Sequence, residues 1–222
     1  SYGGYAKDVV VKEAFVLRVP ENLDYAATAP LLCAGVTVYS PLKHWKVGPG
    51  MKVAIMGLGG LGHMAVKFAA AMGAETYVLG HSLSKAQDAK DFGAKDYLMT
   101  TEIFETHKDF FDVILNTTSA DLDLDSLLGM LKVGGTFVTV GISPNKQEFH
   151  PFSVVTGLRS IAGANTGSIA ATQDMLDFCG EHNIVSTIEM VDASDPKTID
   201  DAYARVVDSD IRYRFVIDAS TI

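Results

Sequence analysis

The chain has 222 residues, of which 48% are hydrophobic and 20% charged, an ordinary composition for one or two soluble globular domains. Its formal net charge of −9 argues against nucleic acid or an anionic membrane as a partner, and no apolar run reaches the roughly 18 residues of a membrane span. Two cysteines make no disulfide framework and nothing resembles a signal peptide, so the sequence predicts a cytoplasmic protein.

The N-terminal part of the chain predicts the edge of another domain. Strand-like segments at residues 5–11 and 14–18 are too short to form a sheet alone. A mostly apolar helix is predicted from Asn22 to about Ser40, where Pro41 disturbs it. The turn Gly48-Pro49-Gly50 then leads into the next strand.

Residues 51–85 follow the pattern strand, glycine-rich turn, helix, strand. Lys52–Met56 is an apolar run typical of a strand buried on both faces, and 75–79 is a second strand. Between them a G-x-G-x-x-G opens a helix, which is the context that a dinucleotide site requires. The glycines allow a tight turn, close approach to the pyrophosphate and close helix packing, and the phosphates meet the helix N-terminus. We therefore predict that Gly57-Leu58-Gly59-Gly60-Leu61-Gly62 is a dinucleotide-binding turn and not an unrelated glycine-rich turn.

The end of the second strand indicates which dinucleotide is bound. NAD enzymes usually carry an acid about twenty residues past the glycines, where it holds the ribose 2′-hydroxyl. This chain has Gly80-His81-Ser82-Leu83-Ser84-Lys85 there, and its first carboxylate is Asp88. A 2′-phosphate would meet no repulsion, two serines can donate hydrogen bonds to it, and Lys85 can supply a charge. The segment favours NADP; the alternative is that Ser84 caps the next helix and Lys85 is solvated.

Strands and helices continue to alternate along the chain, as in a parallel sheet with right-handed crossovers. Further strands are predicted at 97–99, 111–115, 136–140 and 159–164, with helices at 86–92 and 121–132. Beyond them the pattern predicts helices at about 169–181 and 198–208 and strands near 184–191 and 213–217. Ligands of such sheets bind at the carboxyl ends of the strands, so Thr117 and the Gly141 backbone are candidate cofactor contacts. The alternative for both is ordinary loop chemistry.

One segment before the glycine turn is more specific: Leu31-Leu32-Cys33-Ala34-Gly35-Val36-Thr37-Val38-Tyr39-Ser40-Pro41-Leu42. With the segments 140–141, 163–168 and 212–216, it resembles the zinc-dependent medium-chain alcohol dehydrogenases, in particular the NADP-dependent cinnamyl alcohol dehydrogenase type. The resemblance implies an α/β fold: a doubly wound parallel Rossmann sheet with a remnant of the GroES-like catalytic domain at both termini. Residues 1–40 would be the catalytic domain's edge and a linking helix, 41–185 the NADP-binding domain, and 186–222 the return segment. Most of the N-terminal catalytic domain would then be missing from this chain.

The family's site residues carry over where this sequence matches them. Cys33 matches a protein ligand of the catalytic zinc, but the second Cys and the His of that site are not found, and no catalytic residue is identified beyond the metal ligand. Cys179 is predicted to lie in the core, and the histidines after His44 are predicted to be surface or capping residues. The positions assigned to the cofactor are Thr37, Gly57, Leu58, Gly59, Gly60, Leu61, Gly62, Gly80, His81, Ser82, Ser84, Lys85, Thr117, Val140, Gly141, Ile142, Ala164, Asn165 and Thr166.

The resemblance implies a zinc-dependent oxidoreductase that reversibly reduces small aldehydes to alcohols with hydride from NADPH. We expect the chain alone to be inactive, because it supplies a single ligand for zinc. A homodimer is expected through the open strand edge near residues 159–164. Two alternatives remain: a zinc-free, quinone oxidoreductase-like reductase, and an isolated NADP-binding module without catalysis.

Overall fold

The computed structural model describes residues 4–100 and 103–222, which divide into two compact units. One unit is formed by residues 37–166, and the other joins the segment up to Val36 to residues 167–222. The predicted cofactor domain, residues 41–185, differs from the first unit mainly at residues 167–185, which pack with the terminal segments.

The unit of residues 37–166 is built on a six-stranded sheet with the order β3-β2-β1-β4-β5-β6. All neighbouring strands are parallel. From β1 the chain proceeds outward through β2 and β3, then returns to β4 on the other side of β1, so the order reverses between β1 and β4. This confirms the predicted doubly wound α/β fold. The strands are β1 (Lys52–Met56), β2 (Glu75–Gly80), β3 (Asp96–Met99), β4 (Phe111–Asn116), β5 (Leu131–Thr139) and β6 (Ser160–Gly163).

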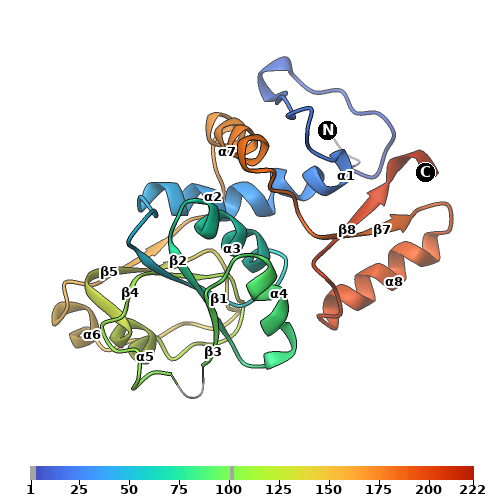
Figure 1. Ribbon diagram of the computed structural model, residues 1–222. Coiled ribbons are helices and arrows are strands. Elements are labelled where there is room, and N and C mark those ends of the chain that lie inside the picture. The colour runs from blue at the N-terminus through green and yellow to red at the C-terminus, as the bar shows by residue number, and fades with distance from the viewer. Residues whose placement is uncertain (1–3, 101–102) are drawn as a thin grey trace. The chain divides into compact units, whose positions relative to one another are not determined.

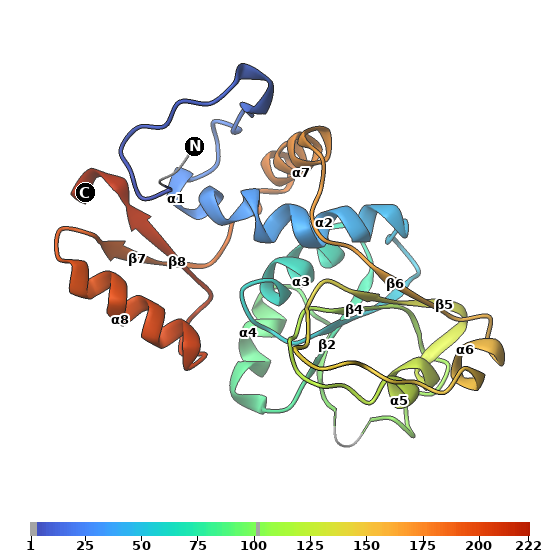
Figure 2. The same ribbon diagram turned by 180° about the vertical axis from the view of Figure 1, so that it is seen from behind.

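Helices cover both faces of this sheet. α3 (Gly62–Ala71) and α4 (Ala86–Asp91) lie on one face and α5 (Leu124–Gly129) on the other, as Figures 1 and 2 show from opposite sides. The short helix α6 (Phe152–Val155) follows β5 and packs against α5. Since crossovers in parallel sheets are right-handed, the reversal of strand order is what sends α5 to the opposite face from α3 and α4.

The core of this unit lies against both faces of the sheet. On the α5 side, Ala54, Leu79 and Ile114 from the central strands join Leu127 and Leu128 in one buried cluster. Side chains alternate along a strand, so the neighbouring residues of β1 point to the other face, towards α3. There the core is completed by the fully buried residues Val53, Ile55, Met64, Ala65 and Phe68.

The ends of these elements follow local rules, with one departure from prediction. The Asp123 side chain accepts a hydrogen bond from the Ser126 backbone and begins α5. At the end of α3, the cap residue Met72 is followed by Gly73, whose φ of +87° suits glycine. The helix predicted over residues 121–132 is shorter, because β5 begins at Leu131. That strand reaches Phe111 through an irregular register, which the sequence pattern did not reveal.

The second unit contains a two-stranded parallel sheet, and α2 runs from this unit into the first. Among the described residues, no helix has the length and hydropathy needed to cross a bilayer. The remaining elements of the chain are η1 (Glu13–Phe15), α1 (Tyr25–Thr28), η2 (Ala29–Leu32), α2 (Ala34–His44), η3 (Leu83–Lys85), α7 (Ile169–His182), β7 (Ile188–Asp192), α8 (Pro196–Val207), β8 (Arg214–Asp218) and η4 (Ala219–Thr221).

The N-terminal segment departs from the sequence prediction. Residues 5–11 and 14–18 form no strands, because none of the described residues pairs with them along an edge. The helix predicted from Asn22 to Ser40 is divided into α1, η2 and α2, with a break at Cys33. Pro41 does not end α2, which continues to His44.

Candidate functional site

The glycine turn follows β1 directly, and two of its glycines are required by the protein's own packing. Gly57 has a φ of +86°, in the left-handed region, and a Cβ there would lie 2.4 Å from Thr118 Cγ2. A Cβ on Gly62 would lie 2.0 Å from the Gly57 carbonyl oxygen, because the start of α3 packs directly on the turn. These contacts agree with the roles of the first and third glycines of the motif.

Gly59 has no such packing requirement. It is exposed, and a Cβ built there meets no heavy atom within 4 Å. The open space there would let a ligand approach the backbone closely. The turn leads into α3, a helix of 10 residues whose first N–H groups and dipole favour an anion. The space beside Gly59 therefore suits a phosphate group.

The loops after β4 and β5 hold the glycine turn in place. Thr117 donates its hydroxyl to the Met56 carbonyl oxygen at 2.8 Å. The Asn116 side-chain oxygen accepts from the backbone N–H of Thr118 at 3.0 Å and from its hydroxyl at 2.9 Å. A Cβ on Gly141 would lie 2.0 Å from the Thr118 carbonyl oxygen, so a side chain there would separate the two loops. The strand-end rule points to the segment Asn116-Thr117-Thr118 and selects Thr117 as the candidate contact; the structure adds that Asn116 and Thr118 fix the loop itself.

The carboxyl end of β2 has an unexpected neighbour. Tyr97, on the adjacent strand β3, places its hydroxyl oxygen 1.9 Å from where a Cβ on Gly80 would lie. Burial raises the pKa of the Tyr97 hydroxyl, so that group is neutral at physiological pH. No side chain fits at position 80 while the Tyr97 hydroxyl occupies this space. The first exposed side chain after β2 is therefore that of His81.

The turn after β2 is bound to the glycine turn. Lys85 donates from Nζ to the Leu58 carbonyl oxygen at 3.0 Å. Ser82, not Ser84, acts as the cap: its hydroxyl oxygen accepts from the Ser84 backbone N–H at 3.3 Å and thereby begins η3. The alternative in which Ser84 caps the next helix and Lys85 is only solvated is therefore wrong. The lysine lies beside the loop that is suited to phosphate.

The other predicted cofactor positions lie on the same unit. Ala164 donates from its backbone to Thr139 at the end of β5 (3.0 Å), and Val140 donates to the Asn116 carbonyl oxygen at 3.0 Å. Leu58 is buried, Gly60, Leu61 and Thr37 are half-buried, and Ile142, Asn165 and Thr166 are exposed.

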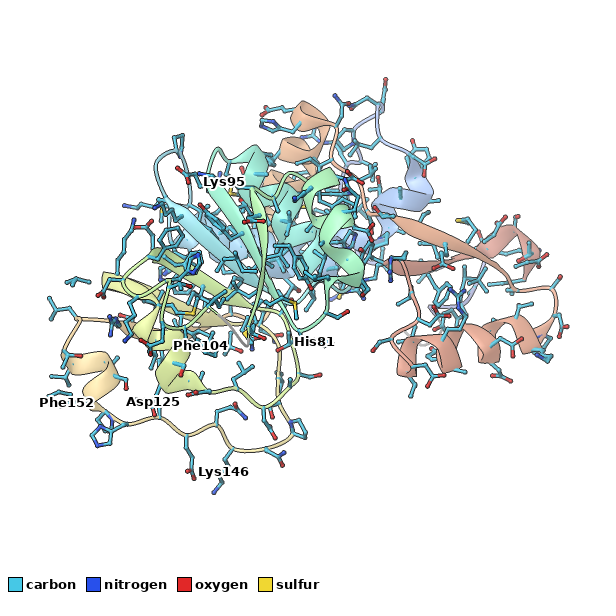
Figure 3. All side chains as sticks on the ribbon, turned by 60° about the horizontal axis from the view of Figure 1, so that its bottom comes forward. His81, Lys95, Phe104, Asp125, Lys146 and Phe152 are labelled. Carbon is cyan, nitrogen blue, oxygen red and sulfur yellow. The ribbon has the colours of Figure 1, made fainter. Side chains whose placement is uncertain are left out.

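Because all six strands are parallel, their carboxyl ends share one edge of the sheet. In Figure 3, His81 marks this edge and Lys95 marks the opposite one.

Two further groups on α3 lie behind the glycine turn. His63 is fully buried, its Nδ1 lies 3.2 Å from the Gly59 carbonyl oxygen, and its ring lies against Phe92, so the prediction of a surface or capping residue is wrong for it. One turn later, Lys67 places its Nζ 4.8 Å from the centre of the Phe92 ring. Burial lowers the pKa of Lys67 to about 8.

The predicted metal ligand lies in the unit formed by the termini. Cys33 is exposed at the end of η2, and Arg214 on β8 is close enough for the charge of a Cys33 thiolate to raise the pKa of the arginine. Burial outweighs that effect and lowers the pKa of Arg214, whose Nε atom is buried without a hydrogen-bond partner. Sequence analysis had not identified Arg214, because only the fold brings it to Cys33.

The described residues do not form a zinc site by themselves. Nowhere in residues 4–100 and 103–222 do three or more His, Cys, Asp or Glu side chains gather as a metal site requires. The other cysteine, Cys179, is buried, with its Sγ 3.6 Å from Met175 Sδ and its pKa raised to about 12 by burial, which confirms that it belongs to the core.

The sequence of this chain is similar to those of known dehydrogenases. A sequence model for the family described as zinc-binding dehydrogenase matches residues 60–181. A probable formaldehyde dehydrogenase of Bacillus subtilis is 51% identical over the whole chain, and the chain spans 63% of that relative's length.

Solved structures show the same similarity. A cinnamyl alcohol dehydrogenase from Sorghum bicolor superposes with a TM-score of 0.89 at 41% identity, covering 95% of this chain and 60% of that one. A cinnamyl alcohol dehydrogenase from Helicobacter pylori, determined in complex with NADP(H), superposes with a TM-score of 0.85 at 39% identity. The match with the Helicobacter pylori enzyme covers 96% of this chain and 60% of that one.

Proposed function

Because the chain belongs to the zinc-binding dehydrogenase family, we propose that it binds NADP as part of an oxidoreductase that interconverts small aldehydes and alcohols. The observation that carries this proposal is the exposed backbone at Gly59, open to a ligand at the N-terminus of α3. The alcohol dehydrogenases among the similar proteins support the reaction class. The bound nicotinamide would supply or accept the hydride.

The chain's own residues bind and orient this cofactor. The backbone N–H groups of the glycine turn and of the first turn of α3 meet the pyrophosphate. Thr117 and Gly141 keep the neighbouring loops against that turn, so the phosphates enter a preformed site. Thr37, Val140, Ile142 and the segment 164–166 are proposed to contact the nicotinamide end of the cofactor.

The preference for NADP over NAD rests on the turn after β2. No carboxylate occupies residues 80–87, so a 2′-phosphate meets no repulsion there. Lys85 already lies on the glycine turn, where its amine is close to the ribose end of a bound dinucleotide. Its hydrogen bond to the Leu58 carbonyl oxygen is exchanged for a stronger, charge-assisted bond to phosphate.

The described residues by themselves supply too few ligands for a catalytic zinc ion. Cys33 is the only residue of this sequence assigned to the metal, and one thiolate does not make a zinc site. We therefore expect the 222-residue chain to be inactive alone. Elemental analysis showing one tightly bound zinc per chain would contradict this expectation.

A homodimer is part of the same proposal. β6 is the last strand of the sheet, and beside it α6 and the following turn expose Phe152, Val155 and Leu158. An open strand edge next to apolar side chains is suited to pairing with a second copy. A strictly monomeric mass by light scattering at micromolar concentration would contradict this proposal.

The test of cofactor binding uses two matched glycine substitutions. Gly59→Ala and Gly129→Ala both add a methyl group where no heavy atom lies within 4 Å, so neither should disturb the fold. Only Gly59 faces the predicted pyrophosphate, so Gly59→Ala should weaken NADP binding by at least about tenfold, or ~1.4 kcal/mol. Gly129→Ala should leave the affinity unchanged in titration calorimetry. Equal affinities for the two variants would refute the assignment of the site.

A further inference from the structure

The connection from β5 to α6 carries part of the proposed cofactor site but has no helix or strand of its own. It consists of residues 140–151, and Figure 3 labels Lys146 on it. Ile142, near its start, is 82% exposed and is one of the positions proposed to meet the nicotinamide end of NADP. A loop of this kind moves unless hydrogen bonds hold it, so its anchors decide whether it is ready for a ligand.

The first anchor of this connection is the end of β4. The backbone N–H groups of Val140 and Gly141 both donate to the Asn116 carbonyl oxygen, at 3.0 and 3.1 Å. The Thr139 hydroxyl donates to the Gly141 carbonyl oxygen at 2.7 Å. These bonds fix the chain just before Ile142 and leave the chain after it to a second anchor.

Beyond Ile142, the connection is held by one carboxylate. Asp121, in the loop after β4, accepts from Ser143 Oγ at 2.6 Å and from Asn145 Nδ2 at 2.9 Å. It also accepts from Gln147 Nε2 at 3.2 Å. Because β4 and β5 are parallel neighbours, the loops that follow them leave the sheet at the same edge and can meet there. The backbone of Ile142 is therefore held from both sides.

The two aspartates that follow Asp121 have different partners. Asp123 caps α5 through the backbone N–H of Ser126. Asp125 accepts from the backbone N–H of His150 at 2.9 Å and so holds the far end of the connection. Of these three carboxylates, Asp121 is the one whose hydrogen bonds lie beside the proposed cofactor contact.

We propose that Asp121 is a positioning residue for the cofactor: it holds Ser143 so that the neighbouring Ile142 backbone is already in place for the nicotinamide end of NADP. This inference rests on the proposed binding of NADP. A loop that is ordered before binding loses less conformational entropy when the ligand arrives, so its contacts contribute more to affinity. Hydrogen bonds from Ser143 and Asn145 lower the pKa of the Asp121 carboxyl, which is therefore ionised at neutral pH and only accepts.

The experiment compares two ligands of the 222-residue chain by titration calorimetry. One is NADP⁺, and the other is 2′-phospho-ADP-ribose, which keeps the adenosine, the phosphates and both riboses of NADP⁺ but lacks nicotinamide. Asp121→Asn turns an amide NH₂ group towards side chains that donate, so at least one anchoring bond is lost. It should weaken NADP⁺ by about fivefold, the worth of roughly one net hydrogen bond, and leave 2′-phospho-ADP-ribose within about twofold of wild type.

Asp125→Asn is the matched control. It removes the same charge from an exposed carboxylate of the same segment, but its backbone partner lies at the far end of the connection. The ratio of NADP⁺ to 2′-phospho-ADP-ribose affinities should keep its wild-type value in Asp125→Asn. Ser143→Ala removes an anchoring bond from the other side and should also lower the ratio. Because both changes break the same link, the double variant Asp121→Asn/Ser143→Ala should have the ratio of Asp121→Asn alone.

Three results would count against the proposal. A ratio that is unchanged in Asp121→Asn, or that falls equally in Asp125→Asn, would overturn the role of Asp121 while leaving NADP binding intact. Effects of Asp121→Asn and Ser143→Ala that multiply in the double variant would refute the link through Ser143. A wild-type chain that binds neither ligand would overturn both this inference and the NADP proposal.

Discussion

The packing of α3 on the glycine turn gives a quantitative prediction for Gly62→Ala. The added Cβ would lie 2.0 Å from the Gly57 carbonyl oxygen, 2.9 Å from its carbon and 3.1 Å from Thr117 Oγ1. Ordinary contact begins at 3.4 Å, so the turn and the helix must separate by about 1.4 Å, the difference between 3.4 and 2.0 Å. The obstructing atoms are backbone and are held by the hydrogen bond from Thr117 to Met56, so no side-chain rotation relieves the contact.

This overpacking should cost about 3 kcal/mol, the upper end of the usual range, because the backbone has to move. For a chain of this size, a loss of about 3 kcal/mol lowers Tm by roughly 6–12 °C. Thermal denaturation followed by circular dichroism measures the shift, and titration calorimetry should find no NADP binding. Gly129→Ala is the matched control, since its methyl group meets no heavy atom within 4 Å. If Gly62→Ala melts at the same temperature as Gly129→Ala, the argument from close packing is wrong.

Two further predictions follow from the pKa values of buried groups. The pKa of Lys67 is lowered to about 8 from 10.5, so between these values the unfolded chain binds more protons than the folded one and the free energy of unfolding rises with pH. Methionine at position 67 does not titrate, so the stability of Lys67→Met relative to wild type should fall by about 1–2 kcal/mol from pH 7.5 to 10 in urea denaturation. This figure is reduced because the amine is partly exposed. An unchanged difference in stability would contradict the burial of Lys67. A thiol reagent at pH 8 should label the exposed Cys33 but not Cys179, whose pKa is raised to about 12, and labelling of native Cys33→Ser would refute the buried assignment.

The sequence alone was sufficient for the sheet and for the glycine turn, because both depend on local requirements. A strand buried on two faces needs a short apolar run, and β1, β2 and β4 each have one. The spacing of Gly57 and Gly62 meets a need of the backbone itself: a left-handed φ and the close approach of a helix. Such needs are encoded within a few residues, so pattern and spacing predict them.

The terminal segments show the limit of local patterns. Residues 5–11 and 14–18 have the composition of strands, but a strand forms only where a neighbouring edge pairs with its N–H and C=O groups. No described residue provides that edge, and the segments remain irregular. The helix predicted over Asn22–Ser40 is likewise divided at Cys33, because Pro30 and the following residues form a 3-10 turn.

The details that decide recognition at the site come from residues far apart in the sequence. Thr118 sits where a Cβ on Gly57 would lie, and Tyr97 fills the space beside Gly80. His63 is buried behind the turn, although nothing in its sequence neighbours distinguishes it from an exposed histidine. These contacts arise only when parallel strands bring their carboxyl ends to one edge, where Tyr97 leaves no room for a side chain at position 80 and His81 is the first exposed side chain after β2.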